Sequence, residues 1–172
     1  MVAAQLKGFP INQKEIARQT ADIESQIRRK LRVVESSREV RIFQNKYGKF
    51  NPNSNSHLTL LFRDILKEKA GWRNKKYSVD EDTLKAVGSK FSKALLAYKK
   101  LAKFLSTYIN PLDASIKDSH TFEDKRIHPL FNDTNTDTGR LSAEDPSVQN
   151  YPKRNEETKV IRKAFVAPGV RS

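Results

Sequence analysis

The stretch Lys90-Phe-Ser-Lys-Ala-Leu-Leu-Ala-Tyr-Lys-Lys-Leu-Ala-Lys-Phe-Leu-Ser-Thr-Tyr-Ile-Asn110 predicts a long amphipathic helix over residues 90–109. Its apolar side chains recur at helical spacing: Phe91, Leu95, Tyr98, Leu101, Ala102, Leu105 and Tyr108. Lysines 93, 99, 100 and 103 lie around the same helix, and no acidic residue occurs between Lys85 and Asn110. A solvated helix face explains any single lysine. An exposed helix usually mixes both signs of charge, however, so the uncompensated set favours a polyanionic partner.

Three further helices are predicted in the preceding residues. Asn12 with Glu15 three residues later resembles a capping box. The face that follows has helical spacing: Ile16, Thr20, Ile23, Ile27, Leu31 and Val34. A second apolar run, from Leu58 to Leu66, is expected to end with Gly71 as its C-cap. Ser78 with Glu81 repeats the capping-box spacing and predicts a short helix through Val87.

The last sixty or so residues have a different pattern. Residues 126–132 and 135–142 are rich in β-branched and turn residues and predict two short strands. Asn155 is a candidate cap for a short helix over 156–163, and residues 164–168 resemble a strand cut short. The fold class is therefore mostly α with a small β portion. A boundary is expected at Asn110-Pro111, where proline ends the helical pattern, dividing the chain into residues 1–110 and 111–172.

The charge distribution supports this division. The chain has 172 residues and a formal charge of +13. Residues 1–50 hold 11 basic and 5 acidic residues, residues 51–110 hold 12 and 5, and residues 111–172 hold 10 of each. The whole excess lies in the helical part. Nucleic acid is the first candidate partner, and an anionic membrane surface is the second.

Composition also excludes several classes of function. The chain has no cysteine, so it has no disulfide framework, thiolate nucleophile or cysteine-based zinc site. Its three histidines are too far apart for metal-ligand spacing. No pair of carboxylates stands out as an acid–base or metal site, and no glycine-rich phosphate loop occurs. No secretory signal or membrane span is recognisable, which predicts a soluble cytoplasmic protein.

Two polar segments are candidates for contacts with nucleic acid. Asn53, Ser54 and Asn55 precede a predicted helix, where backbone amides and short polar side chains suit phosphate. Ordinary N-capping uses the same residue types and is the more frequent outcome. Ser106 and Thr107 offer hydroxyls that can reach phosphate or cap a helix end. In the segment 136–152, Arg140, Gln149 and Asn150 carry the donors and acceptors that base edges require, although a surface turn explains each of them singly.

At these residues the sequence resembles the family A, bacterial polymerase I-like, DNA polymerases. The most specific match is Thr138-Gly-Arg-Leu-Ser, followed by Asp145-Pro and Gln149-Asn. It extends through Ala164-Phe-Val-Ala-Pro, and upstream through Arg126-Ile-His and Tyr98-Lys-Lys-Leu-Ala-Lys to Phe50-Asn-Pro-Asn-Ser. The motifs keep the family order over nearly the whole chain. The resemblance implies antiparallel thumb helices followed by an incomplete α+β palm.

The resemblance also implies roles for particular residues. Arg140 matches the arginine that reads the minor groove at the primer end, and Arg154 matches one near the incoming nucleotide. The positions that match duplex contacts are Asn53, Ser54, Asn55, Lys99, Lys103, Thr136 and Gln149. Three departures put single contacts in question: Ser147 stands where an asparagine is common, and Ser56-His57 and Ala143-Glu144 replace other residue types.

By the same resemblance, the metal-binding aspartates and the fingers are expected beyond Ser172. The chain alone is therefore expected to be inactive. Mg²⁺ is expected only in the complete polymerase, with a second polypeptide or C-terminal portion supplying the rest of palm and fingers. Two interpretations remain. The first is a polymerase fragment that binds primer-template duplex DNA, and the alternative is a non-enzymatic duplex-binding accessory module.

Overall fold

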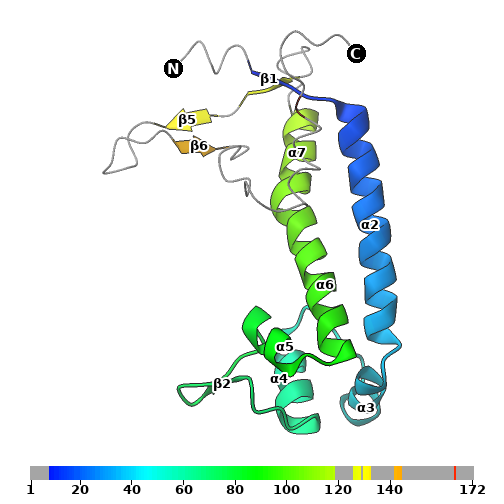
Figure 1. Ribbon diagram of the computed structural model, residues 1–172. Helices are drawn as coiled ribbons and strands as arrows, with labels where there is room; N and C mark the ends of the chain where they lie inside the picture. Colours follow the sequence, from blue (N-terminus) through cyan, green and yellow to red (C-terminus); the bar gives the residue numbers. More distant parts are fainter. Residues whose placement is uncertain (1–7, 119–125, 129, 133–141, 145–164, 166–172) are drawn as a thin grey trace. The chain divides into compact units, whose positions relative to one another are not determined.

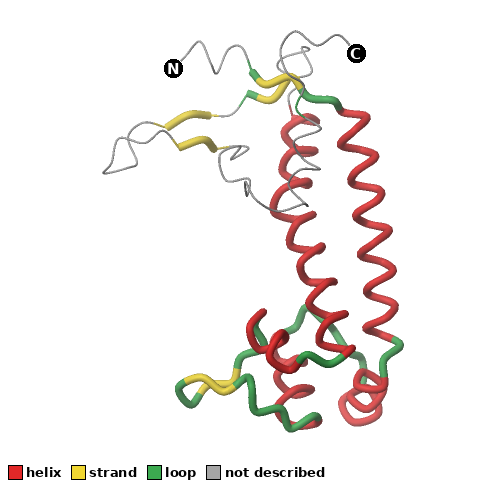
Figure 2. Tube along the Cα trace, viewed as in Figure 1, coloured by secondary structure: helices red, strands yellow, loops and turns green. Residues whose placement is uncertain are grey.

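A computed structural model describes residues 8–118, 126–128, 130–132, 142–144 and 165 of the chain (Figure 1). Most of the described residues are helical, which confirms the predicted fold class (Figure 2). The helical segments are α2 (Gln13–Glu35), α3 (Arg38–Tyr47), α4 (Asn55–Thr59), η1 (Leu60–Ile65), α5 (Glu81–Val87), α6 (Lys90–Phe104), η2 (Leu105–Ile109) and α7 (Asn110–Asp118). The strands are β1 (Phe9–Pro10), β2 (Trp72–Arg73), β3 (Lys76–Tyr77), β4 (Arg126–Ile127), β5 (Leu130–Asn132) and β6 (Ser142–Glu144).

The chain divides into two compact units. One comprises residues 24–103, and the other combines residues 1–23 with 104–172. This division follows compactness rather than charge, so the boundary expected at Asn110 from composition stays a prediction about subdomains.

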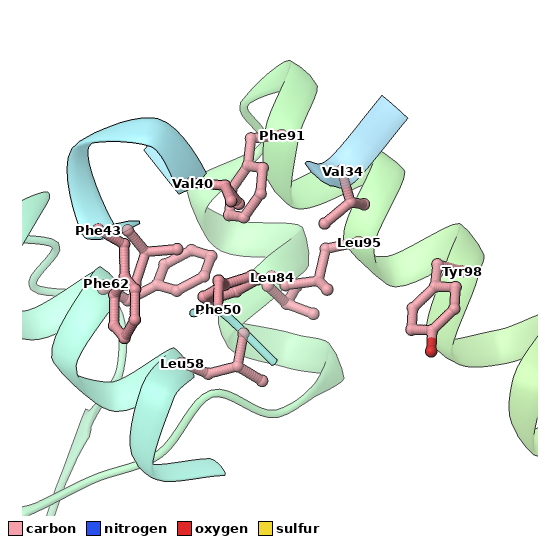
Figure 3. Packing of buried hydrophobic residues seen from close by; sticks show 11 residues of the cluster. Val34, Val40, Phe43, Phe50, Leu58, Phe62, Leu84, Phe91, Leu95 and Tyr98 are labelled. Carbon is pink, nitrogen blue, oxygen red and sulfur yellow. The ribbon is translucent and has the colours of Figure 1, made fainter. Parts of the chain in front are cut away.

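The unit of residues 24–103 has a well-defined hydrophobic core (Figure 3). Its buried members are Val34, Val40, Phe43, Phe50, Leu58, Leu61, Phe62, Leu84, Phe91, Leu95 and Tyr98. Ile27 and Leu31 pack partly buried against them. Apart from Phe50, which follows α3 in a loop, these residues come from the apolar faces that helical spacing predicted and from α3. Burial of those faces therefore holds the unit together.

The second unit brings distant parts of the chain together. β1 pairs antiparallel with β4, with Phe9 opposite Ile127, and Ile11 forms an isolated bridge with Phe165. Gly8 has a φ of +57°, and a Cβ there would lie 2.6 Å from Cε1 of His128, so only glycine fits. β5 pairs with β6. The strand expected within 126–132 is confirmed as β4 and β5, whereas the helix expected at 156–163 lies outside the described residues.

The start of α2 agrees with half of the predicted capping box. Asn12 Oδ1 accepts a hydrogen bond from the Glu15 amide at 3.1 Å. The Glu15 carboxylate, however, accepts from Arg18 at 2.8 Å and from Gln19 at 2.8 Å along the same helix. The N-cap is therefore the one predicted, while the glutamate stabilises the first turns through i,i+3 and i,i+4 contacts.

The expected helix end at Asn110-Pro111 is wrong. The helix continues through η2 and α7 as far as Asp118. The residues just before Pro111 form the π-helical segment η2, in which the Asn110 amide donates to the Leu105 carbonyl. Pro111 then stands in the first turn of α7, where its missing amide and its ring are tolerated.

Gly71 is not the C-cap that the sequence suggested. The helical run ends at Ile65, and Lys67 adopts a φ of +56° instead. The Glu68 amide donates to the Phe62 carbonyl at 2.9 Å and closes the helix end. Gly71 is needed for space, because a Cβ there would lie 2.5 Å from Cζ of Tyr77 and 2.7 Å from the Ser78 carbonyl oxygen.

The cap of α5 is Asp80 rather than Ser78. Asp80 Oδ1 accepts from the Thr83 amide at 2.8 Å, and this bond holds the pKa of Asp80 below its usual value. Ser78 contributes its carbonyl, which accepts from the Thr83 hydroxyl at 3.2 Å. Both residue types cap helices, and here the aspartate occupies the N-cap position.

Replacing this cap tests its contribution. Asp80→Ala should lower the free energy of unfolding by about 1 kcal/mol at neutral pH, because a helix donor loses its acceptor. A carboxyl whose pKa is lowered on folding stabilises above its ordinary pKa, and that contribution disappears as the pH falls through the folded value. The difference between wild type and variant should therefore shrink in acid. Urea unfolding at neutral pH and at acidic pH measures this difference in the free energy of unfolding. Asp82→Ala, in the same helix turn, is the control, and equal losses for the two variants would contradict the capping role.

Candidate nucleic-acid interface

The polar tip, residues 51–56, leads from the end of α3 into the first residues of α4. Its short side chains form hydrogen bonds within the tip and to the following turn. Ser54 caps α4 by accepting from the His57 amide at 3.4 Å, and its hydroxyl lies 2.8 Å from that of Ser56. Asn51 Oδ1 accepts from the Asn53 amide at 2.9 Å. Ordinary capping is thus what Ser54 does, while Asn53 and Asn55 are exposed.

His57 supports the tip from behind, a role that the sequence analysis missed. Its Nδ1 accepts from the Asn51 amide at 3.1 Å, so this histidine carries its proton on Nε2 when neutral. Its ring lies 5.2 Å from Phe43 and 6.4 Å from Phe50, measured between centroids. The only available signal was the departure from the family pattern at Ser56-His57.

A long-range hydrogen bond joins the tip to α6. Asn53 Nδ2 donates to the Tyr98 hydroxyl at 3.0 Å, and the other amide atom, Oδ1, lies 3.3 Å from the same oxygen. Tyr98 is only 5% exposed and belongs to the core. The bond therefore anchors an exposed tip residue to a fixed point, one residue before Lys99.

Lys99 differs from the other lysines of α6. It is half-buried, and burial lowers the pKa of its ammonium group. Within the described part of the chain, no hydrogen bond or ion pair reaches this ammonium group. A partly desolvated cation without a counter-charge attracts an anion more strongly than a fully hydrated one, because binding compensates the cost of burial.

Lys100 is already paired. The Glu81 carboxylate lies 3.0 Å from Lys100 Nζ and 2.8 Å from Lys85 Nζ. These two contacts lower the pKa of Glu81. The excess charge of α6 is thus smaller than the absence of acids after Lys85 suggested. The i,i+4 spacing of Glu81 and Lys85 was visible in the sequence, whereas the contact with Lys100 was not.

The structure brings together part of the predicted site. Asn53, Ser54, Asn55, Lys99 and Lys103 all belong to the unit of residues 24–103, and Lys103 lies one helical turn beyond Lys99. Ser106 and Thr107 are exposed on η2 in the other unit. The remaining predicted site residues, Thr136, Arg140, Gln149, Asn150 and Arg154, lie outside the described residues.

Among the described residues, no helix is long and apolar enough to cross a membrane. In the same ranges, no group of three or more histidine, cysteine, aspartate or glutamate side chains is arranged to hold a metal ion.

By composition and fold, the chain is a basic, mostly helical protein. Residues 17–171 match the model of DNA polymerase family A, and the chain belongs to that family. It is 33% identical over 165 residues to DNA polymerase I of Caldicellulosiruptor bescii, covering 94% of this chain and 18% of that protein. It is 32% identical over 170 residues to DNA polymerase I of Helicobacter pylori, covering 97% and 17%.

A solved structure resembles the fold as well. The POL domain of Pol1 from M. smegmatis, in complex with DNA primer-template and dNTP, superposes with a TM-score of 0.75 at 28% identity. The match covers 93% of this chain and 27% of that one. The chain thus spans less than a fifth of the curated relatives described above and about a quarter of this structure.

Proposed function

We propose that the chain binds primer-template duplex DNA as the thumb and early palm of a family A DNA polymerase. The observation that carries the proposal is the half-buried, uncompensated Lys99, which directly follows Tyr98, the residue that anchors the tip through Asn53. A cation and a set of exposed amides held in one fixed arrangement suit successive phosphates of a DNA backbone. The M. smegmatis structure contains primer-template DNA, which supports this choice of polyanion.

Two kinds of contact with DNA would have different roles: phosphate contacts would position the duplex, and base contacts would read its sequence. Lys99, Lys103 and the tip residues would contact phosphates, which fix the register of the duplex but carry no sequence information. Arg140, Gln149 and Asn150 would contact base edges near the primer end, with Thr136 beside them and Arg154 near the nucleotide. The hydroxyls of Ser106 and Thr107 would donate hydrogen bonds to the phosphate backbone of the DNA.

Catalysis is not assigned to this chain alone. Phosphoryl transfer by polymerases uses metal ions held by carboxylates. By the family resemblance, we assign Mg²⁺ and the transfer step to the complete polymerase, and the grip on the duplex to this chain.

The phosphate contact has a matched pair of variants on one helix. Lys99→Met should weaken duplex binding and lower the slope of log affinity against log salt by about 1, because one released counterion is lost. Lys100→Met should change the slope less, since the Glu81 carboxylate already contacts that ammonium group. Fluorescence anisotropy with a labelled primer-template measures both. Lys99→Met removes a half-buried charge and so should not destabilise the fold. An unchanged slope in this variant would remove Lys99 from the phosphate contacts.

A primer-extension assay distinguishes the two interpretations of the chain, a polymerase fragment and a non-enzymatic accessory module. The chain is mixed with a polypeptide carrying the remaining palm and the fingers of a family A polymerase. Extension that depends on both polypeptides supports the fragment. Duplex binding without extension, for every such polypeptide tried, would favour the non-enzymatic module instead.

A further inference from the structure

Trp72 is the single tryptophan of the chain and is left 50% exposed on the hairpin formed by β2 and β3. It is not a member of the hydrophobic core of residues 24–103. An indole is the largest apolar side chain, and its burial would stabilise the fold, so its position at the surface suggests a binding role.

The hairpin holds this ring in place. The Tyr77 ring lies opposite, 5.5 Å away between centroids and nearly perpendicular at 87°. The Tyr77 hydroxyl donates to the Glu68 carbonyl at 2.9 Å, and Gly71 leaves the space that the ring needs. The hairpin loop, Asn74 and Lys75, has φ values of +44° and +65°, typical of a tight type I′ turn. Trp72 is thus supported on one side and open on the other.

Basic residues flank Trp72 in the sequence, and two of them, Lys67 and Lys69, line the same groove as its ring. Those in the segment 67–76 are Lys67, Lys69, Arg73, Lys75 and Lys76, all exposed, against the single acid Glu68. The nearby Asp64 is occupied by Arg63, which donates two hydrogen bonds to its carboxylate at 2.6 and 2.9 Å. The surface around the indole is therefore strongly positive.

An open groove of about 540 Å³ adjoins the ring. Trp72 lines it together with Arg63, Asp64 and residues 67–69 at the end of η1. An aromatic wall beside exposed ammonium groups has the composition of sites that stack a base and neutralise its phosphates.

We propose that this hairpin is a second nucleic-acid site, specific for single-stranded DNA, in which a base stacks on Trp72 and the surrounding lysines contact the backbone. Duplex DNA can place phosphates against the lysines. It offers no base to stack on the indole, because its base faces are covered by their neighbours in the stack. An acidic polypeptide would likewise pair with the lysines and would stack no base on the indole. The site therefore goes beyond the proposed grip on the duplex and does not depend on it.

Because Trp72 is the only tryptophan, its fluorescence reports this site alone. Titration of the 172-residue chain with a short oligothymidylate should quench the emission through stacking. A long blunt-ended duplex and poly-glutamate should leave it nearly unchanged. Equal quenching by the duplex or by poly-glutamate would overturn the proposal, as would no quenching by oligothymidylate.

A pair of exposed aromatic residues provides the matched variants. Trp72→Ala should weaken binding of a labelled oligothymidylate by roughly tenfold or more, as loss of one stacked base does in single-strand-binding proteins. Tyr47→Ala removes another exposed aromatic beside a lysine, Lys46, and should have little effect. Equal losses for the two variants would refute the site. The duplex grip is tested separately by the salt slope of Lys99→Met, so failure of the duplex grip and failure of this site are distinguishable.

Discussion

Phe62→Ala should lower the free energy of unfolding of residues 24–103 by about 3–5 kcal/mol. Phe62 is fully buried, and its ring lies 5.8 Å from that of Phe91. The lost transfer energy adds to the cost of the cavity, since α4, η1 and α6 are held by several other contacts and cannot collapse into it. Urea unfolding followed by Trp72 fluorescence measures the effect.

The control for this prediction is a truncation at the surface. Val33 is 57% exposed on α2, so Val33→Ala should change the free energy of unfolding by less than about 0.5 kcal/mol. If both variants lost similar amounts, residues 24–103 would not unfold as one cooperative unit with Phe62 at its centre.

The second large effect concerns salt. If about six phosphates are neutralised, duplex affinity should fall roughly a thousandfold between about 50 and 200 mM salt. The first 110 residues hold 23 basic and 10 acidic residues, enough for that number of contacts. The cause is counterion release, which depends on the number of phosphates contacted and not on base sequence.

Anisotropy with a fixed primer-template and increasing KCl measures this dependence. A duplex of the same length and scrambled sequence should give the same slope, which serves as the control for base readout. An affinity that hardly changed with salt would show that the lysines of the chain are not the groups that hold DNA.

The helical part of the fold could be predicted because its signals are local. Apolar spacing placed the faces of α2, η1 and α6, and Asn12 correctly marked the start of α2. The errors arose where two local rules competed. Ser78 and Asp80 are both good caps, and Pro111 ends a helix unless the preceding turn widens, as η2 does. The helix α3, capped by Ser37, and the β2–β3 hairpin were not predicted from the sequence.

The candidate site was predictable in kind more than in geometry. Composition marked α6 as basic, but only the structure distinguishes the half-buried Lys99 from Lys100, which Glu81 holds. The bond between Asn53 and Tyr98 joins residues 45 positions apart, and Tyr98 carries an apolar pattern that conceals its hydroxyl. Contacts of this kind depend on how helices pack, which no short stretch of sequence records.

The same bond has a consequence for how the tip opens. Surface loops usually exchange their amide hydrogens through local fluctuations that leave the core intact. Here Asn53 is held by a tyrosine whose ring is packed in that core, while the Asn51 amide is held by His57. Separating the tip from α6 therefore disturbs the core itself, so the amides of this loop should exchange on the timescale of the whole unit rather than of a loop.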